Sequence, residues 1–279
     1  MRIENTQEYM YMPKRFPDIE GIVIDFDGTI AGKTHEVSPR VRDAIMSVKD
    51  RVKVSLCTGR PTLWVQRIAE ELGITDSLHV ADGGGRVIDG KGKVLWERLI
   101  SASVVQEMAA EAHRRDFTIT AQINGEDVSP WIPPLTADSI PLLTHILFRS
   151  FSRQDAESFM EWMAARSLPV YMVLSHYRDH EGPMEWLADV TAQGANKQHA
   201  LLHLAEREGL NLKKFMAIGD GYNDFPLLMA CGFKVAMGNA PAELKAIADH
   251  VAPSVDEDGV AEAIEHFVLK SQIPISNDQ

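Results

Sequence analysis

The sequence has little of what marks secreted, membrane-spanning or nucleic-acid-binding proteins. It contains two cysteines, Cys57 and Cys231, each beside apolar residues, and we expect reduced, buried thiols rather than a disulfide. No apolar run approaches the ~20 residues that span a bilayer, and no run of lysines and arginines forms a polybasic patch. The net charge of −12 would repel nucleic-acid phosphates, although it does not exclude a small anionic substrate.

The N-terminal segment also lacks an export signal. Residues 1–18, MRIENTQEYMYMPKRFPD, contain no continuous apolar stretch, and we interpret them as a leader of unassigned role. These absences predict a cytoplasmic protein with neither a nucleic acid nor a membrane as partner, while the oligomeric state stays open. At 279 residues, the chain is long enough for one large α/β domain or for a core with an insertion.

Strands and helices are expected to alternate near both ends of the chain. The apolar runs at 21–26 and 52–59 predict strands buried on both faces, and helical spacing follows each of them, at 38–50 and 61–73. This order is typical of a parallel sheet with right-handed crossovers. The same alternation returns late in the chain, with strands expected at 214–220, 233–238 and 250–253 and helices at 195–210, 223–232, 240–249 and 259–269.

The middle of the chain has a different organisation. A hairpin is expected at 85–97, with its turn at Gly90-Lys91-Gly92, and strands and helices then follow in mixed order around a proline-rich loop at 128–141. The sequence therefore predicts an α/β protein. A Rossmann-like parallel-sheet core over residues 1–82 and 192–279 would carry an inserted α+β cap over residues 83–191.

Acidic residues follow two of the predicted strands. Asp25 and Asp27 come after GIVI in DFDGT, and Asp220 and Asp224 lie in GDGYND. Ligands collect beyond the carboxyl ends of parallel strands, and two carboxylates so close raise each other's pKa unless a divalent cation or a shared proton intervenes. Oxygen ligands favour Mg²⁺ over zinc. Either cluster alone would be compatible with an ordinary strand-end turn.

Two further segments would suit a phosphate group. Thr58 and Gly59 in LCTGR end a predicted strand just before a helix, where a hydroxyl and a backbone N–H could bind phosphate oxygens. Lys197 stands at the start of another predicted helix and is a cation of the kind that binds phosphate. Taken singly, the first is an ordinary turn and the second an ordinary surface lysine.

In this order, the four segments resemble the haloacid dehalogenase superfamily of phosphotransferases. The matching features are DxDGT at 25–29, the hydroxyl of Thr58, Lys197, and GDxxND at 219–224. The TGRP at 58–61, the long insertion and the NK..AL pattern around Lys197 are similar to the Cof-type branch, subfamily IIB, whose α+β cap is called C2B. The resemblance covers roughly residues 19–270, and the sequence of the cap itself is not diagnostic.

The resemblance implies distinct roles for the acidic residues. Asp25 would attack phosphorus and become an aspartyl-phosphate, and Asp27 would protonate the leaving oxygen and then activate water. Mg²⁺ would be held by Asp25, Asp220 and the backbone carbonyl of Asp27, with Asp224 binding it directly or through a neighbouring ligand.

The same resemblance implies which residues bind the transferring group. Thr58, Gly59, Lys197 and Asn223 would stabilise charge on the phosphoryl oxygens. One position departs from the family pattern. VADGGG places Asp82 where Cof-type proteins have the asparagine of an Asn-Gly pair, and this either changes a hinge hydrogen bond or adds negative charge near the cleft.

Residues of the cap should close over the site and set specificity. Trp131, His176 and Arg178 are the chosen candidates. Each has a simpler interpretation: Trp131 as a packing anchor among prolines, and the others as part of a solvated loop, SHYRDHEG. The wider set of polar or aromatic residues in irregular segments is Asn124, Asp127, Trp131, His176, Tyr177, Arg178 and His180.

The combined pattern predicts a Mg²⁺-dependent phosphatase for a small phosphorylated metabolite such as a sugar phosphate or phosphoglycolate. A phosphomutase similar to phosphomannomutases is the first alternative, since the motifs do not separate the two. A catalytically silent binding module is the second, although the complete set of acids argues against it. A dehalogenase is disfavoured because such enzymes lack the aspartate that Asp27 provides.

Overall fold

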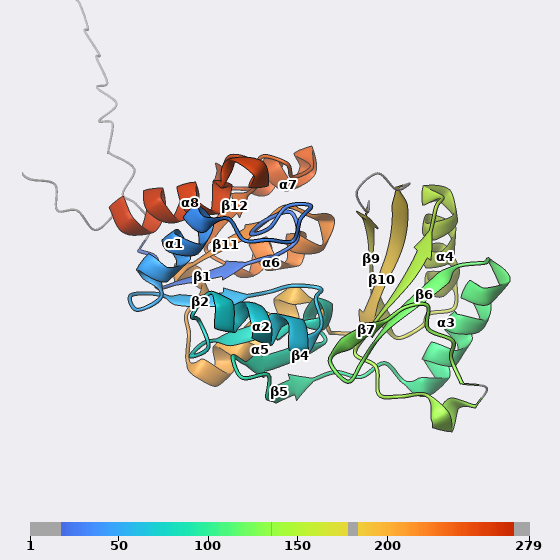
Figure 1. Ribbon diagram of the computed structural model, residues 1–279. Helices are drawn as coiled ribbons and strands as arrows, with labels where there is room; N and C mark the ends of the chain where they lie inside the picture. Colours follow the sequence, from blue (N-terminus) through green and yellow to red (C-terminus); the bar gives the residue numbers. More distant parts are fainter. Residues whose placement is uncertain (1–17, 135, 178–183, 271–279) are drawn as a thin grey trace, which may run out of the picture.

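The computed structural model of the protein describes residues 18–134, 136–177 and 184–270. Figure 1 shows two parts, a larger one built around a parallel sheet and a smaller one in which two helices cover one face of a second sheet. None of the helices in these ranges has both the length and the apolar character of a membrane span. Cys57 and Cys231 are buried and free, as expected.

The core sheet has five parallel strands in the order β13-β12-β11-β1-β2. Strand β1 (Gly21–Ile24), which lies between β11 and β2, is buried along its whole length, as its continuous apolar sequence predicts. In register, Ile24 lies beside Ile218 and Leu56, so the segments that follow these three strands meet at one edge. The other strands are β2 (Lys53–Leu56), β11 (Phe215–Gly219), β12 (Phe233–Ala236) and β13 (His250–Val251).

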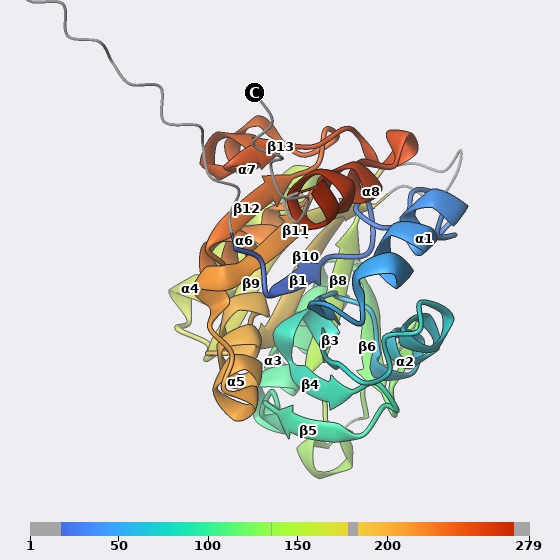
Figure 2. The same ribbon diagram turned by 90° about the vertical axis from the view of Figure 1, so that its left-hand side faces the viewer.

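Helices cover both faces of this sheet (Figure 2). One hydrophobic cluster joins the sheet to α1 (Pro39–Val48), α2 (Thr62–Glu71) and α8 (Gly259–Ile264). A second cluster joins it to α5 (Lys197–Glu208), α6 (Phe225–Ala230) and α7 (Ala242–Ile247). The predicted α/β fold with a parallel sheet is confirmed.

The hairpin β4 (Arg86–Asp89) and β5 (Val94–Glu97) forms as expected. It pairs with β3 (Leu78–Ala81), a strand that was not predicted, and a parallel bridge from Val80 to Cys57 aligns β3 with β2. Val87 and Ile88 pack in the two core clusters. Because the hairpin buries its apolar residues there, we propose a cap of residues 102–192.

The cap is an antiparallel sheet with helices on one face. Its strand order is β7-β6-β8-β10-β9, and α3 (Ala102–Arg114) and α4 (Arg153–Ala165) pack against apolar side chains that include Ile146, Phe148 and Val190. The opposite face is turned toward the core (Figure 1). The strands are β6 (Thr118–Ile123), β7 (Glu126–Val128), β8 (His145–Ser150), β9 (Val170–Tyr177) and β10 (Glu185–Ala192).

Candidate active site

Three of the predicted acids meet at the carboxyl edge of the core sheet. Asp25 follows β1, Asp220 follows β11, and Asp224 ends the short helical turn η4 (Tyr222–Asp224). Their carboxylate oxygens lie within 4.8 Å of one another. We call this group the aspartate cluster; its oxygen donors are of the kind that hold Mg²⁺.

Lys197 supplies the buried cation of the site. It is the first residue of α5, whose N-cap Asn196 accepts a hydrogen bond from the His199 N–H at 2.9 Å. Its Nζ donates to Asp25 Oδ1 at 2.5 Å and to Asp224 Oδ1 at 2.6 Å. The side chain is 2% exposed, so the predicted surface alternative for this lysine does not apply.

The charges of the site are unbalanced. Burial raises the pKa of Asp25 well above its ordinary value, and the neighbouring Asp224 adds to the effect while Lys197 opposes it. Burial, with Asp224, also raises the pKa of Asp220 to about 7. Burial alone would lower the pKa of Lys197, but Asp224 and Asp25 together raise it. One lysine thus faces three carboxylates, and a bound cation would offset the remainder.

Asp220 and Asp224 are held by their surroundings. Thr29 Oγ1 donates to Asp220 Oδ1 at 2.9 Å, and Asn239 Nδ2 donates to Oδ2 at 3.0 Å. Asp224 Oδ2 accepts the backbone N–H groups of Asp220 and Gly221 at 2.9 Å each. Asn239 was not predicted, because a single asparagine after a strand carries no signal by itself.

Steric crowding explains why the DFDGT motif has glycine at residue 28. Gly28 has φ +82°, and a Cβ at this position would lie 2.2 Å from Asp220 Oδ2. Any side chain would therefore push Asp220 away from the aspartate cluster.

Asp27 does not point its carboxylate into the aspartate cluster. The side chain is 42% exposed and accepts hydrogen bonds from Arg60 Nε at 2.8 Å and Nη2 at 2.5 Å, with His35 Nδ1 3.2 Å away. Of the four acids predicted to serve the metal, Asp27 is the one whose side chain lies apart. Its carboxylate contacts Arg60 and His35 instead of the three carboxylates of the cluster.

The predicted phosphate-binding loop follows β2 on the same edge. Thr58 is 1% exposed and its Oγ1 accepts the Arg60 N–H at 3.2 Å. A Cβ at Gly59 would meet nothing within 4 Å. The Gly59 carbonyl accepts a hydrogen bond at 2.8 Å from Gln122 Nε2 of cap strand β6, so the cap touches this loop directly.

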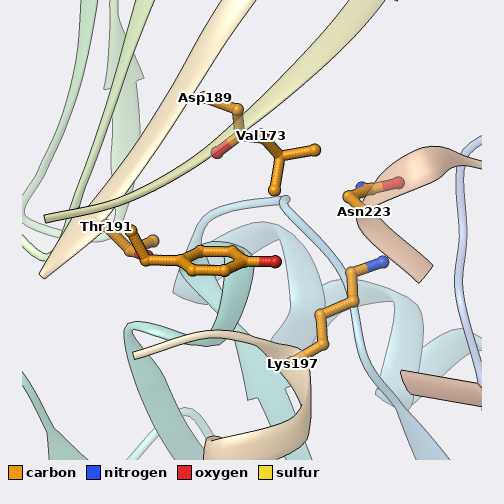
Figure 3. A pocket seen from close by; sticks show the side chains of 7 residues that line it. Val173, Asp189, Thr191, Lys197 and Asn223 are labelled. Atoms are coloured by element: carbon orange, nitrogen blue, oxygen red, sulfur yellow. The ribbon is translucent and has the colours of Figure 1, made fainter. Parts of the chain in front are cut away.

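A pocket lies between the two parts of the molecule (Figure 3). Lys197, Asn223 and Gly83 line it from the core. The cap contributes Tyr171 and Val173 from β9 and Asp189 and Thr191 from β10. These four cap residues were missed by sequence reasoning. The available sequence signal was their spacing, since the pocket residues lie two apart within each strand. The same spacing occurs in any sheet with one exposed face.

The cap residues chosen from the sequence lie elsewhere. Trp131 is 8% exposed in the hydrophobic core of the cap, so its prediction as a specificity residue is corrected to the packing role. Its backbone N–H donates to the Ile119 carbonyl at 2.7 Å. Asn124 and Asp127 are exposed around the turn between β6 and β7.

The remaining cap candidates lie at or beyond the end of β9. His176 and Tyr177 belong to this strand, with His176 opposite Trp186 of β10 and Tyr177 opposite Glu185. Arg178 and His180 lie outside the described residues. The predicted loop SHYRDHEG therefore begins as strand.

Asp82 is a buried acid at the junction of core and cap. It has φ +54° and is fully buried. Thr144 Oγ1 donates to its Oδ2 at 2.6 Å, and Arg86 Nη1 lies 3.4 Å from the same oxygen. Burial raises the pKa of Asp82, although Arg86 and Thr144 act in the opposite direction. The Asp82 carboxylate thus accepts a hydrogen bond from a cap residue at the junction of core and cap.

Comparison with known proteins matches this chain to the haloacid dehalogenase-like hydrolase family over residues 22–134 and 143–264. It is 29% identical to the 5-amino-6-(5-phospho-D-ribitylamino)uracil phosphatase YcsE of Bacillus subtilis, over 90% of this chain and 97% of that protein. It is 28% identical to a phosphoglycolate phosphatase of Archaeoglobus fulgidus, over 93% and 99% respectively.

A solved structure agrees with the fold. The subclass IIB sugar phosphatase BT4131 of the same superfamily aligns with a TM-score of 0.70 at 23% identity, over 89% of this chain and 98% of that one. The family match covers most of the chain and includes the aspartate cluster and Lys197. The chain therefore belongs to the haloacid dehalogenase-like hydrolases.

Proposed function

We propose that the protein is a Mg²⁺-dependent phosphomonoesterase that works through an aspartyl-phosphate on a small phosphorylated metabolite in the cytoplasm, with neither a nucleic acid nor a membrane as partner. The observation that carries this proposal is the buried aspartate cluster bound to Lys197, a residue that also lines a pocket between core and cap. A nucleophile, a cation and a metal-binding set of oxygens thus lie together where a phosphate group would enter.

Asp25 performs the first half of the proposed reaction. A carboxylate oxygen of Asp25 attacks phosphorus, the bond to the leaving oxygen breaks, and Asp27 gives that oxygen a proton. Lys197 then balances charge on the phosphoryl oxygens, as do the Thr58 hydroxyl, the Gly59 amide and the Asn223 side chain.

Asp27 also serves the second half. Having lost its proton, Asp27 accepts one from water, which attacks phosphorus and releases phosphate from Asp25. Arg60 fixes the Asp27 carboxylate with two hydrogen bonds, so the group is oriented before substrate arrives. Asp27 is exposed and outside the aspartate cluster, a position that lets it exchange protons with solvent between turnovers.

The metal would be held by the aspartate cluster. Asp25 and Asp220 would supply oxygens, with Asp224 binding directly or orienting its neighbours. When bound, Mg²⁺ supplies positive charge that offsets the repulsion between the Asp25 carboxylate and a phosphate dianion.

Hydrolysis is favoured over phosphoryl transfer within a sugar. The relatives are named phosphatases, one for a ribitylaminouracil phosphate and one for phosphoglycolate. Their substrates share a phosphomonoester on a small molecule and differ in the rest. This supports a small phosphomonoester as the substrate of this protein. The identity of the leaving group would be selected by residues of the cap.

A panel of phosphorylated metabolites, assayed for free phosphate, tests the proposal. We expect release of phosphate with Mg²⁺, loss of activity with excess EDTA, and recovery when Mg²⁺ is restored. Formation of an isomer without free phosphate would favour a mutase. Turnover that survives EDTA would contradict the metal dependence.

A further inference from the structure

The cap wall of the pocket is polar and built from two paired strands. In the sheet, Tyr171 lies opposite Thr191 and Val173 lies opposite Asp189. Directly paired residues project from the same face of a sheet, and all four side chains line the pocket that Lys197 and Asn223 line from the core (Figure 3). A substrate whose phosphate reaches Lys197 therefore presents its leaving group to this wall.

Asp189 is held in place by a buried histidine. Its Oδ1 lies 2.5 Å from Nε2 of His145, which is on the neighbouring strand β8 and is 1% exposed. The Asp189 side chain itself is 15% exposed. The histidine behind it fixes the carboxylate in one orientation and leaves it at the pocket surface as an oriented hydrogen-bond acceptor.

The backbone of the core leaves room for this pair. Gly83 has φ +63°, and a Cβ there would lie 3.3 Å from His145 Nε2 and 3.4 Å from Thr191 Cγ2. A side chain at residue 83 would be strained and would crowd the histidine. The glycine next to Asp82 thus keeps the space between the junction and the cap wall open.

The charges of the pocket select against a second anionic group. Among the described residues that line it, Lys197 is the cation, and it already binds Asp25 and Asp224. The phosphate of a substrate would engage it further. A carboxylate on the leaving group would meet the carboxylate of Asp189, and neither group can donate a hydrogen bond to the other. His145 offsets part of the Asp189 charge from behind, but two like charges at the pocket surface still repel in a partly buried site.

Hydroxyl groups suit the same wall. A hydroxyl donates to a carboxylate and accepts from another hydroxyl. Asp189 provides the acceptor, and the Tyr171 hydroxyl provides a donor. Thr191 is buried and its Oγ1 donates to the Ala195 carbonyl, so its own proton is already used within the protein.

We infer that Asp189, held by His145, is a specificity-determining residue that accepts hydrogen bonds from an uncharged, hydroxyl-rich leaving group and disfavours leaving groups that carry a carboxylate. The inference rests on the proposed function and narrows its substrate class to polyol or sugar phosphates.

The test compares two substrates that differ at one carbon. D-Ribitol 5-phosphate carries a primary alcohol where 5-phospho-D-ribonate carries a carboxylate, and p-nitrophenyl phosphate reports the core chemistry separately. For the unmodified protein with Mg²⁺ we expect kcat/KM to favour ribitol 5-phosphate by about tenfold or more. Equal or reversed preference, with p-nitrophenyl phosphate hydrolysed, overturns this inference alone. Hydrolysis of none of the three overturns the proposed function with it.

Substitutions test which residues cause the preference for ribitol 5-phosphate over 5-phospho-D-ribonate. Asp189→Asn removes the charge and should lower the preference about tenfold, while ribonate phosphate becomes a better substrate. Tyr171→Phe keeps the ring and should lower the preference about threefold. Asp138→Asn is the matched control, since Asp138 is an exposed residue of the cap outside the pocket. The inference is overturned if Asp189→Asn and Tyr171→Phe both fold and both keep the original substrate preference.

Discussion

In both the core site and the cap pocket, a buried basic side chain contacts aspartate carboxylates, but the number of carboxylates for each basic group differs. In the core, Lys197 faces the three carboxylates of the aspartate cluster. In the cap, His145 faces the single carboxylate of Asp189. The core therefore has more carboxylates than cations, and protons or a bound cation would balance them, whereas the single carboxylate of Asp189 has the His145 imidazole as its partner. This difference suits the core to metal and phosphate chemistry and the cap to recognition by hydrogen bonds.

The two sheets that carry these groups also differ. The core strand β1 is buried on both faces, and its functional residues follow the strand. The cap strands β9 and β10 bury one face against helices, and their pocket residues lie within the strands on the other. Function in the core thus sits at the strand ends, where motifs are contiguous. Function in the cap is spread over alternate residues.

Replacing the proposed nucleophile should produce the largest effect. Asp25→Asn is expected to lower kcat for p-nitrophenyl phosphate by at least about 10³-fold, since an amide is a poor nucleophile. Because the change removes one buried negative charge and Lys197 keeps Asp224 as partner, the variant should be no less stable than the original protein. Activity and a urea unfolding curve measure the two effects. Turnover within tenfold of the original would refute the role of Asp25.

Removing the positive charge of Lys197 should increase the excess of negative charge in the core site. Lys197→Met keeps the length of the side chain but leaves Asp25 and Asp224 without their buried partner. We expect a loss of about 3–5 kcal/mol in the free energy of unfolding without metal. Mg²⁺ should restore part of it by supplying the missing charge. If Lys197→Met is as stable as the original protein in EDTA, the aspartate cluster does not need Lys197 for stability, and the prediction is wrong.

The smallest effect is expected at Asp82, between the two regions. Burial raises its pKa, so the folded protein binds this proton more tightly than the unfolded chain. The ionised carboxylate therefore costs stability as pH rises above its unfolded value of about 4. Asp82→Asn should be more stable than the original at pH 8, by on the order of 1 kcal/mol, and the difference should shrink toward pH 4.

Urea unfolding at several pH values measures the effect of this substitution. Arg86 keeps a partner in the variant, because its Nε also lies 3.1 Å from Glu97 Oε2. A stability difference that does not change with pH would contradict the assigned cost of the buried charge.

The core was predictable because its signals are local. Continuous apolar runs predicted β1, β2 and β11, and the helical spacing at 38–50 predicted α1, which is observed at Pro39–Val48 with Ser38 as its N-cap. The acids that meet in space each follow such a run, and a parallel sheet brings strand ends to one edge. Asn239 escaped this reasoning because its contacts with Gly28 and Asp220 are distant in the sequence.

The cap was predictable as an α+β module but not in its details. The hairpin at β4 and β5 was recognised, yet only packing shows that Val87 and Ile88 belong to the core. Trp131 was chosen for its chemistry and lies in the cap interior. Asp189 was passed over because an acid in a strand looks like a solvated side chain until a second strand places His145 behind it.

The amino-acid order alone thus determined the core strands β1, β2 and β11, the acids that follow β1 and β11, and the family resemblance, because those features arise from neighbouring residues and the fixed geometry of parallel strands. Folding in three dimensions decided which face of the cap meets the core, where the hairpin packs and which carboxylate reaches the pocket. These depend on strand register and on contacts between distant residues, such as Asp189 with His145 and Gln122 with Gly59.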